Sequence, residues 1–251
     1  MSTKYRFVAR PPRSYPKRRC VVNLYSFRHN LKNIRTGAAA GPGGMRGKHL
    51  ISLAEVLDES QLKRLKYFCL KYLHTSLPSW FYKVYGAVTT APLFKSAQQD
   101  SEKLRPVGIL DPLVRFLNHE VATANKEAAV NYLEPVQLGC SKAGAHKLVT
   151  AVRSMSEQNK GFVLIKLEIK NIHSQLSRSA VVKELSSIPS LKHLAQYSAA
   201  TLTSNTVLVS RGSIWGEEGD GEMQGNPMAG LRFSVSLQKD LLFLNNEVAE
   251  H

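Results

Sequence analysis

The sequence predicts an α+β fold in which helix exceeds strand, and two patterns support that prediction. From Ser60 to Leu77, apolar residues recur every three or four positions, which is typical of an amphipathic helix. Two segments rich in β-branched and aromatic residues, 84–94 and 104–109, predict a two-stranded ribbon joined by the polar stretch 95–103. Helical and strand segments therefore occur along the same chain.

The outer face of the predicted helix over 60–77 is basic. Four cations stand between its apolar positions, namely Lys63, Arg64, Lys66 and Lys71. Such a face is either the solvated side of a core helix or a surface that contacts phosphate groups. The pattern leaves both interpretations open.

Two helices are predicted after the ribbon. Asp111 and Pro112 are typical of a helix start, and the apolar pattern that follows extends to about residue 121. A second helix is predicted over 143–156, with Gly139 and Gly144 marking the turn between the two.

Two further strands are predicted in the second half of the chain. Residues 162–168 are almost all apolar apart from Lys166, as expected of a central strand that is covered on both faces. Residues 206–215 alternate well enough to predict one strand.

Three more helices are predicted around these strands. Two short ones cover about 179–186 and 190–203, with Pro189 breaking the chain between them. A long helix is predicted over 227–248, with Asn226 as its N-cap and Pro227 at its first position.

Charge is distributed unevenly along the 251 residues, which carry a net charge of +15. Residues 1–54 hold twelve Lys and Arg and no acidic residue, whereas the rest holds 22 basic and 19 acidic residues. We therefore predict a basic flexible arm over 1–40, ending at a glycine-rich hinge within 37–44. The arm fits a nucleic acid, an anionic membrane, a nuclear import signal or a solvated tail without a partner. Its densest cations, the candidate nucleic-acid-binding residues, are Arg13, Lys17, Arg18 and Arg19.

Composition bounds the class of protein. With 43% apolar residues the chain can bury a substantial core, as one large or two small domains. The three cysteines are scattered, so neither a disulfide framework nor a zinc site is predicted. No apolar run of membrane-spanning length and no signal-peptide pattern is present. We expect an intracellular protein, nuclear or cytoplasmic, without a membrane partner.

Two stretches of the chain carry a more specific signal. Residues 163–178 read as a strand ending on Glu168, then a turn, then Arg178 opening a helix; residues 221–227 read as a loop that stops at a helix start. In that order and separation they resemble motifs A and B of a reverse transcriptase palm, closest to retrotransposons without long terminal repeats. That family carries Asp where Glu168 stands, an aromatic residue where His173 stands, and usually Asp where Asn226 stands.

Three segments upstream extend the resemblance. Residues 41–50 are similar to the family's glycine-proline motif, 103–108 to its fingers strand, and 137–144 to the loop and helix ahead of motif A. The resemblance implies a right-hand polymerase with mostly helical fingers over 41–160 and a partial palm over 161–251. No Asp-Asp pair occurs in the sequence, so we expect this palm to lack the catalytic motif C hairpin.

The resemblance also implies the chemistry of an RNA-directed DNA polymerase, a nucleotidyltransferase that uses two Mg²⁺ ions. Glu168 would be the catalytic carboxylate and the metal ligand. It extends one methylene beyond Asp, and a misplacement of about 1 Å can cost roughly a hundredfold in rate. One carboxylate cannot hold two octahedral ions.

The remaining site residues follow from the same resemblance. Arg105 and Lys103 would bind triphosphate, although Arg105 is also compatible with a solvated charge at a strand end. His173 would replace the aromatic residue that excludes a ribose 2′-hydroxyl. Gln224 and Gly225 would line the nucleotide and template pocket.

Two further expectations concern the C-terminal part. The acidic residues of 217–222 are interpreted as a solvated hairpin end rather than a metal site. The long helix should leave Leu231, Val235, Leu241 and Leu242 partly uncovered, because the hairpin that would cover them is missing, and the chain should then self-associate.

The sequence leaves three functions open. The first is a degenerate, truncated reverse transcriptase domain of a retroelement, catalytically inactive and at most binding an RNA or DNA template-primer. The second is an active polymerase that is completed by a missing C-terminal part and uses Mg²⁺. The third is a basic RNA-binding or scaffold protein that has kept the fold.

Overall fold

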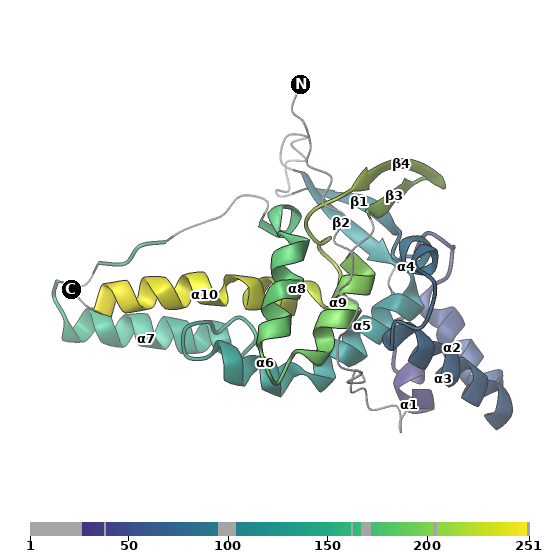
Figure 1. Cartoon of the computed structure of the whole chain (residues 1–251), viewed down its shortest axis with the longest axis horizontal. Coiled ribbons are helices and arrows are strands. Elements are labelled where there is room, and N and C mark those ends of the chain that lie inside the picture. Colours follow the sequence, from purple (N-terminus) through teal and green to yellow (C-terminus); the bar gives the residue numbers. More distant parts are fainter. Residues whose placement is uncertain are drawn as a thin grey trace.

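Ten α-helices, one short 3-10 helix and one four-stranded mixed sheet are formed by the described residues (Figure 1). This computed structural model describes residues 27–37, 39–94, 104–161, 163–166, 172–202 and 205–249. The helices are α1 (Phe27–Lys32), α2 (Gly47–Val56), α3 (Glu59–Leu73), α4 (Ser79–Tyr85), α5 (Pro112–Ala124), α6 (Lys126–Leu133), α7 (Gly144–Gln158), η2 (Ile172–Gln175), α8 (Arg178–Ser187), α9 (His193–Leu202) and α10 (Ala229–Ala249). The strands are β1 (Val88–Phe94), β2 (Leu104–Leu110), β3 (Thr206–Ser210) and β4 (Ser213–Glu218).

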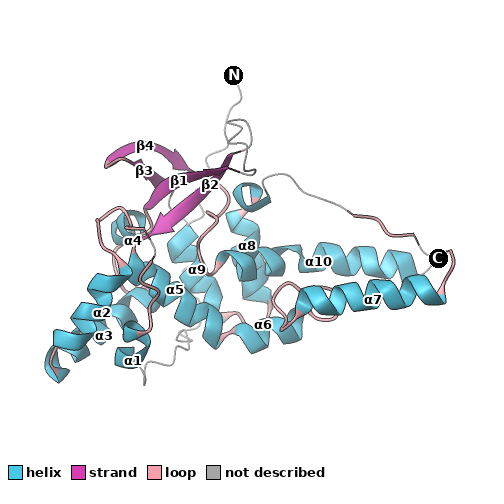
Figure 2. Ribbon diagram, turned by 180° about the vertical axis from the view of Figure 1, so that it is seen from behind, coloured by secondary structure: helices cyan, strands magenta, loops and turns pink. Residues whose placement is uncertain are grey.

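The sheet has the strand order β2-β1-β3-β4 and lies at one edge of the molecule (Figure 2). β1 pairs with β2 antiparallel, with Val88 opposite Leu110, as the predicted ribbon requires. β1 pairs with β3 in parallel, so the sheet joins two parts of the sequence that are more than a hundred residues apart. The prediction of an α+β fold is confirmed.

Two predicted strand boundaries are wrong. Val84 belongs to α4 rather than to the first strand, which begins at Val88. The single strand expected over 206–215 is a hairpin of β3 and β4, because the chain reverses at Arg211 and Gly212 with φ of 48° and 80°. Two consecutive positive φ values are typical of the tight turns that join hairpin strands.

Most helix predictions are confirmed. α3, α5, α7, α8, α9 and α10 lie where apolar periodicity placed them, within a few residues at their ends. The Asp111 side chain accepts a hydrogen bond from the backbone N–H of Leu113 at 3.0 Å, which satisfies one free donor of the first turn of α5. Four helices were not predicted, namely α1, α2, α4 and α6.

The buried strand predicted over 162–168 is wrong in its described part. Residues 163–166 form no strand, and none of the described strands pairs with them. Val163, Leu164 and Ile165 are 77%, 63% and 75% exposed. An apolar run becomes a central strand only where neighbouring strands offer backbone partners on both sides. In the sequence this segment instead stands between α7 and η2.

The expected uncovering of the C-terminal helix is wrong for its first half. Leu231 and Val235 are buried against the core formed by the rest of the chain. Exposed apolar side chains begin further along α10, at Leu242, Phe243 and Leu244. In the half that packs on α6 and α8, this helix therefore needs no additional element to cover it.

The first described helix belongs to the core. Phe27 and Leu31 of α1 are buried, and the ring of Phe27 contacts that of Phe116 at 5.9 Å. Arg28 donates hydrogen bonds to the carbonyls of Ala54 and Leu57, at 3.1 and 2.9 Å, which ties α1 to the end of α2. Part of the segment predicted as a flexible arm over 1–40 is thus folded.

No helix in the described ranges is long and apolar enough to cross a lipid bilayer. Cys69 and Cys140 are free thiols, and burial raises the pKa of the Cys69 thiol to about 12. Cys69 is therefore an inert core residue rather than a reactive one.

We predict that removing residues 1–26 leaves the cooperative unfolding transition in place, whereas removing residues 1–40 does not. The longer deletion takes away Phe27 and Leu31, and deleting large buried side chains typically costs about 2–5 kcal/mol each. Urea unfolding of the two deletion variants, monitored by circular dichroism, tests this prediction. Equal midpoints for the two deletions would show that α1 contributes nothing to the core.

Candidate functional site

A loop over 221–226 lies directly on β2. The backbone N–H of Gly108 donates to the carbonyl of Gln224 at 2.8 Å, and Val107 forms a parallel bridge with Gln224. Two segments more than a hundred residues apart in the sequence are thus joined by backbone pairing. The Gln224 side chain is exposed, so it can contact a ligand.

Glycine is required at this contact. Gly225 has φ of +111°, and a Cβ there would lie 2.5 Å from the carbonyl oxygen of Gly108. A Cβ on Gly108 would lie 2.8 Å from Cβ of Met223. Both glycines let two backbones approach more closely than any side chain allows.

The turn that follows the predicted motif A strand packs on the same loop. The N–H of Glu222 donates to the carbonyl of His173, and the N–H of Gly221 to that of Leu176, both at 2.8 Å. The His173 ring lies against Phe233 with ring centroids 5.7 Å apart, and its Nδ1 is buried without a hydrogen-bond partner. His173, Gln224 and Gly225 therefore belong to one cluster.

A buried ion pair anchors the loop 221–226 to α10. Glu222 and Arg232 are joined at 2.6 Å, and their side chains are 3% and 1% exposed. Arg232 also donates to the hydroxyls of Ser198 and Thr201 on α9, at 3.1 and 2.8 Å. Two buried charges are tolerated only when they are paired and hydrogen-bonded. Glu222 Oε1 takes both bonds, from Arg232 and Asn226, whereas its Oε2 is buried without a hydrogen-bond partner among the described residues.

The amide of Asn226 joins this pair to α5. Its Nδ2 donates to Glu222 at 2.6 Å, and its Oδ1 accepts from Asn118 at 2.9 Å. Oδ1 also accepts from the backbone N–H of Met228 at 3.0 Å, although α10 begins only at Ala229, two residues after the predicted first position Pro227. The Tyr197 hydroxyl donates to Asn118, which closes the network at α9.

Arg178 holds the other end of the loop. Its guanidinium is buried and donates to the carbonyl of Gly221 at 2.7 Å and to the Thr206 hydroxyl at 2.9 Å. Burial lowers the pKa of Arg178, and the nearby carboxylates, Glu218 first, offset part of that effect. Burial also raises the pKa of the Glu218 carboxyl, which Arg178 in turn counteracts.

Several predicted site residues lie partly or wholly outside the described residues. The backbone of Arg105 lies in β2, three residues before Gly108, but its side chain is not described. Six other candidates lie outside the described ranges altogether. They are the catalytic candidate, Glu168, and five cations, Lys103, Arg13, Lys17, Arg18 and Arg19.

The described residues do not supply the donors that Mg²⁺ needs. Among them, no group of three or more His, Cys, Asp or Glu side chains is placed to hold a metal ion. Two of the four carboxylates within 217–222 instead have cationic partners, since Glu217 pairs with Lys83 at 2.9 Å and Glu222 with Arg232.

Comparison with protein-family models and with curated proteins finds no match to this chain.

The residues that hold the loop were not predicted. Arg232 stands on an apolar helix face, and Glu222 stands in an acidic glycine-rich stretch that resembles a solvated turn. The available signal was a charged residue, Arg232, between Leu231 and Val235 on the buried side of the helix. A cation at such a position requires a buried anionic partner.

We predict that Gly225→Ala displaces the loop and destabilises the protein, by about 1–3 kcal/mol for the positive φ alone. Gly230→Ala is the matched control, because nothing lies within 4 Å of its Cβ position, and alanine in a helix interior is favoured by about 0.5–1 kcal/mol. Thermal unfolding of both variants tests this, because the midpoint should fall for Gly225→Ala and not for Gly230→Ala. Similar shifts of the two midpoints in one direction would contradict the close approach to β2.

We predict that the Glu222–Arg232 pair is strongly coupled. Arg232→Leu leaves Glu222 buried without a cation and should cost about 3–5 kcal/mol, whereas Glu222→Leu/Arg232→Leu should recover much of that loss. Lys147→Ala, which breaks an exposed pair with Glu134, should leave the urea midpoint unchanged. Additive costs of the two single Leu variants in urea unfolding would sink this interpretation.

Proposed function

We propose that this chain is a degenerate reverse-transcriptase-like domain of a retroelement that binds nucleic acid without extending it. The observation that carries the proposal is the contact between the loop 221–226 and β2. The resemblance assigns these two segments to one nucleotide pocket. Their pairing brings Gln224 and Gly225 next to the strand that carries Arg105.

The acidic residues of the chain favour binding without polymerisation. Strand extension by two Mg²⁺ ions needs several closely placed carboxylates. The sequence offers Glu168 at the position that matches motif A, and it contains no Asp-Asp pair. The exposed, unpaired residues 163–166 also give the segment leading to Glu168 no strand neighbour in the described structure.

The basic residues favour a nucleic acid as the partner. Residues 1–26 hold seven Lys and Arg and no acidic residue. Such a segment attracts a phosphate backbone of any sequence through release of counterions. The resemblance implies two further cations that bind triphosphate, Arg105 and Lys103.

His173 gives the pocket a different wall from the one that the resemblance implies. An imidazole is smaller and more polar than the aromatic ring that the family uses against a ribose 2′-hydroxyl. Its ring contacts Phe233, and its backbone carbonyl accepts from Glu222, so the residue is fixed in place by two elements. A ribonucleotide should therefore be accommodated as readily as a deoxyribonucleotide.

We predict that the full chain binds RNA and primed templates with a steep dependence on salt but does not extend a primer with Mg²⁺ or Mn²⁺. Each phosphate contact should contribute about 0.7–0.9 to the slope of log affinity against log salt concentration. Removing residues 1–26 should weaken binding at least tenfold near 0.1 M salt, a prediction that anisotropy titrations of a labelled RNA can check.

Two outcomes would replace the proposal. Template-dependent incorporation that Glu168→Ala abolishes would establish the active polymerase instead. Binding that is undetectable at low salt would remove the nucleic acid as a partner and leave the scaffold interpretation. Residues 27–40 must be kept in every variant, because α1 is part of the core.

A further inference from the structure

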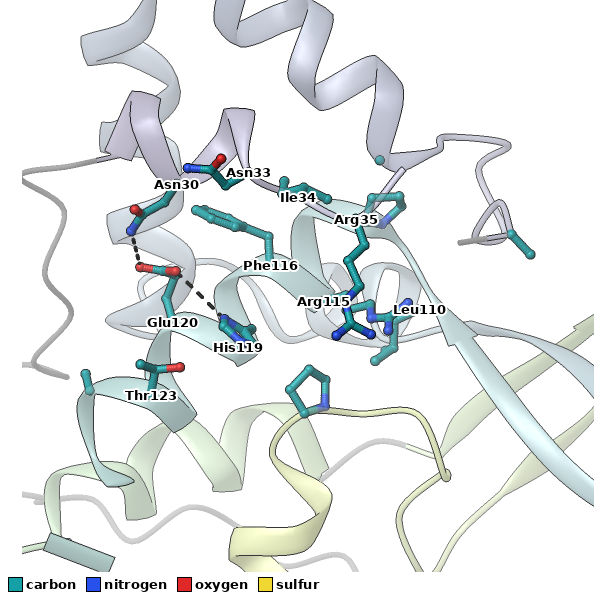
Figure 3. A pocket seen from close by; sticks show the side chains of 15 residues that line it. Asn30, Asn33, Ile34, Arg35, Leu110, Arg115, Phe116, His119, Glu120 and Thr123 are labelled. Carbon is teal, nitrogen blue, oxygen red and sulfur yellow. Dashed lines mark hydrogen bonds and ion pairs between the residues drawn. The ribbon is translucent and has the colours of Figure 1, made fainter. Parts of the chain in front are cut away.

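A pocket of about 760 Å³ lies on the side of the fold that carries α1 and α5 (Figure 3). Its walls are α1, residues 33–35 and Ala39 after it, the start of α2, the end of β2 and α5. Pro227, directly after the loop 221–226, closes one side. The volume falls within the range of about 300–1,000 Å³ that is usual for small-molecule sites.

Two arginines at the pocket have no partner of their own. Arg35 and Arg115 are exposed, and in the described part of the chain neither guanidinium makes a hydrogen bond or an ion pair. Figure 3 draws both toward one end of the pocket, with Asn30, His119 and Glu120 toward the other. Two guanidiniums from different elements in one concavity suit a phosphate, which accepts two parallel hydrogen bonds from each.

The opposite end offers a hydrogen-bond acceptor. Glu120 Oε2 accepts from Asn30 Nδ2 at 2.9 Å, which fixes the carboxylate. Its Oε1 lies 3.9 Å from His119 Nδ1, too far for a hydrogen bond, and accepts no other within the described residues. An acceptor held in this way suits a sugar hydroxyl or a ring amino group.

Apolar side chains also line the pocket. Phe116, Leu110 and Ile34 line it, together with Pro112. A ligand that fills the pocket therefore has an anionic end, a flat apolar middle and a donor group. Inorganic phosphate satisfies the first requirement alone.

We propose that this pocket binds a nucleoside phosphate, with the phosphate at Arg35 and Arg115 and the sugar or base at Glu120. The ligand is either a free nucleotide or one nucleotide of a single strand. Binding here goes beyond the proposed function, because the residues that would contact the ligand, Arg35, Arg115 and Glu120, lie outside residues 1–26 and outside the loop 221–226.

Titration of the full chain with adenosine monophosphate, and with a labelled single-stranded RNA of about eight nucleotides, tests the proposal. Arg35→Ala/Arg115→Ala should weaken binding by about tenfold for each lost guanidinium. Thr123→Trp, on the exposed part of α5 at the rim, should block the pocket without changing its charge. Thermal midpoints establish that each variant is folded. If the arginine variant is not folded, the loss of binding in Thr123→Trp tests the proposal instead.

The matched control is Arg153→Ala/Arg211→Ala, which removes two exposed arginines outside the pocket. It should leave binding of the monophosphate unchanged. Monophosphate binding that the pocket variants weaken identifies a free nucleotide. RNA binding without monophosphate binding, weakened by the pocket variants and not by the control, identifies a strand. Equal losses in the pocket and control variants, wild-type affinity in Thr123→Trp, or no binding of either probe to the wild type would overturn the proposal.

Removal of residues 1–26 separates this inference from the proposed function. Monophosphate binding should survive that deletion even if RNA binding through the basic segment is lost. Loss of monophosphate binding in the deletion variant, with the fold intact, would show that the pocket alone does not bind the nucleotide.

Discussion

The buried ion pair between Glu222 and Arg232 is the constraint on which the arrangement of the loop depends. Two charges without access to water must be neutralised by each other and by hydrogen bonds. Ser198, Thr201 and Asn226 supply those bonds, and they come from α9 and from the loop itself. The pair therefore fixes the positions of α9, α10 and the loop relative to one another.

Local signals in the sequence predicted most of the fold. Apolar periodicity located six helices, and the Asp-Pro and Asn-Pro pairs marked two of their starts, because caps and proline act within one turn. Residues 162–168 show where such reasoning fails. A continuous apolar run is compatible with a buried strand, but burial is decided by neighbours that the run itself does not encode. Val163 to Ile165 are exposed because no described strand pairs with them.

The candidate site was predictable to a similar extent. Asn226 was identified because a helix cap is a requirement of a single position, whereas Gly225 was identified only through the resemblance. The network that supports them was not, since Asn118, Tyr197 and Arg232 come from three helices and meet only in the folded chain. Their separation in sequence, from 35 to more than a hundred residues, leaves no local pattern.

The loop also connects the two surfaces at which ligand binding is proposed. Gln224 lies on the β2 side, and Pro227 forms a wall of the pocket between α1 and α5. Asn226 stands between them and is held by Asn118, Glu222 and the N–H of Met228. Because Pro227 follows Asn226 directly, the bonds that fix the loop on β2 also fix the pocket wall. Both surfaces therefore depend on one buried carboxylate, Glu222, and on the arginine that neutralises it.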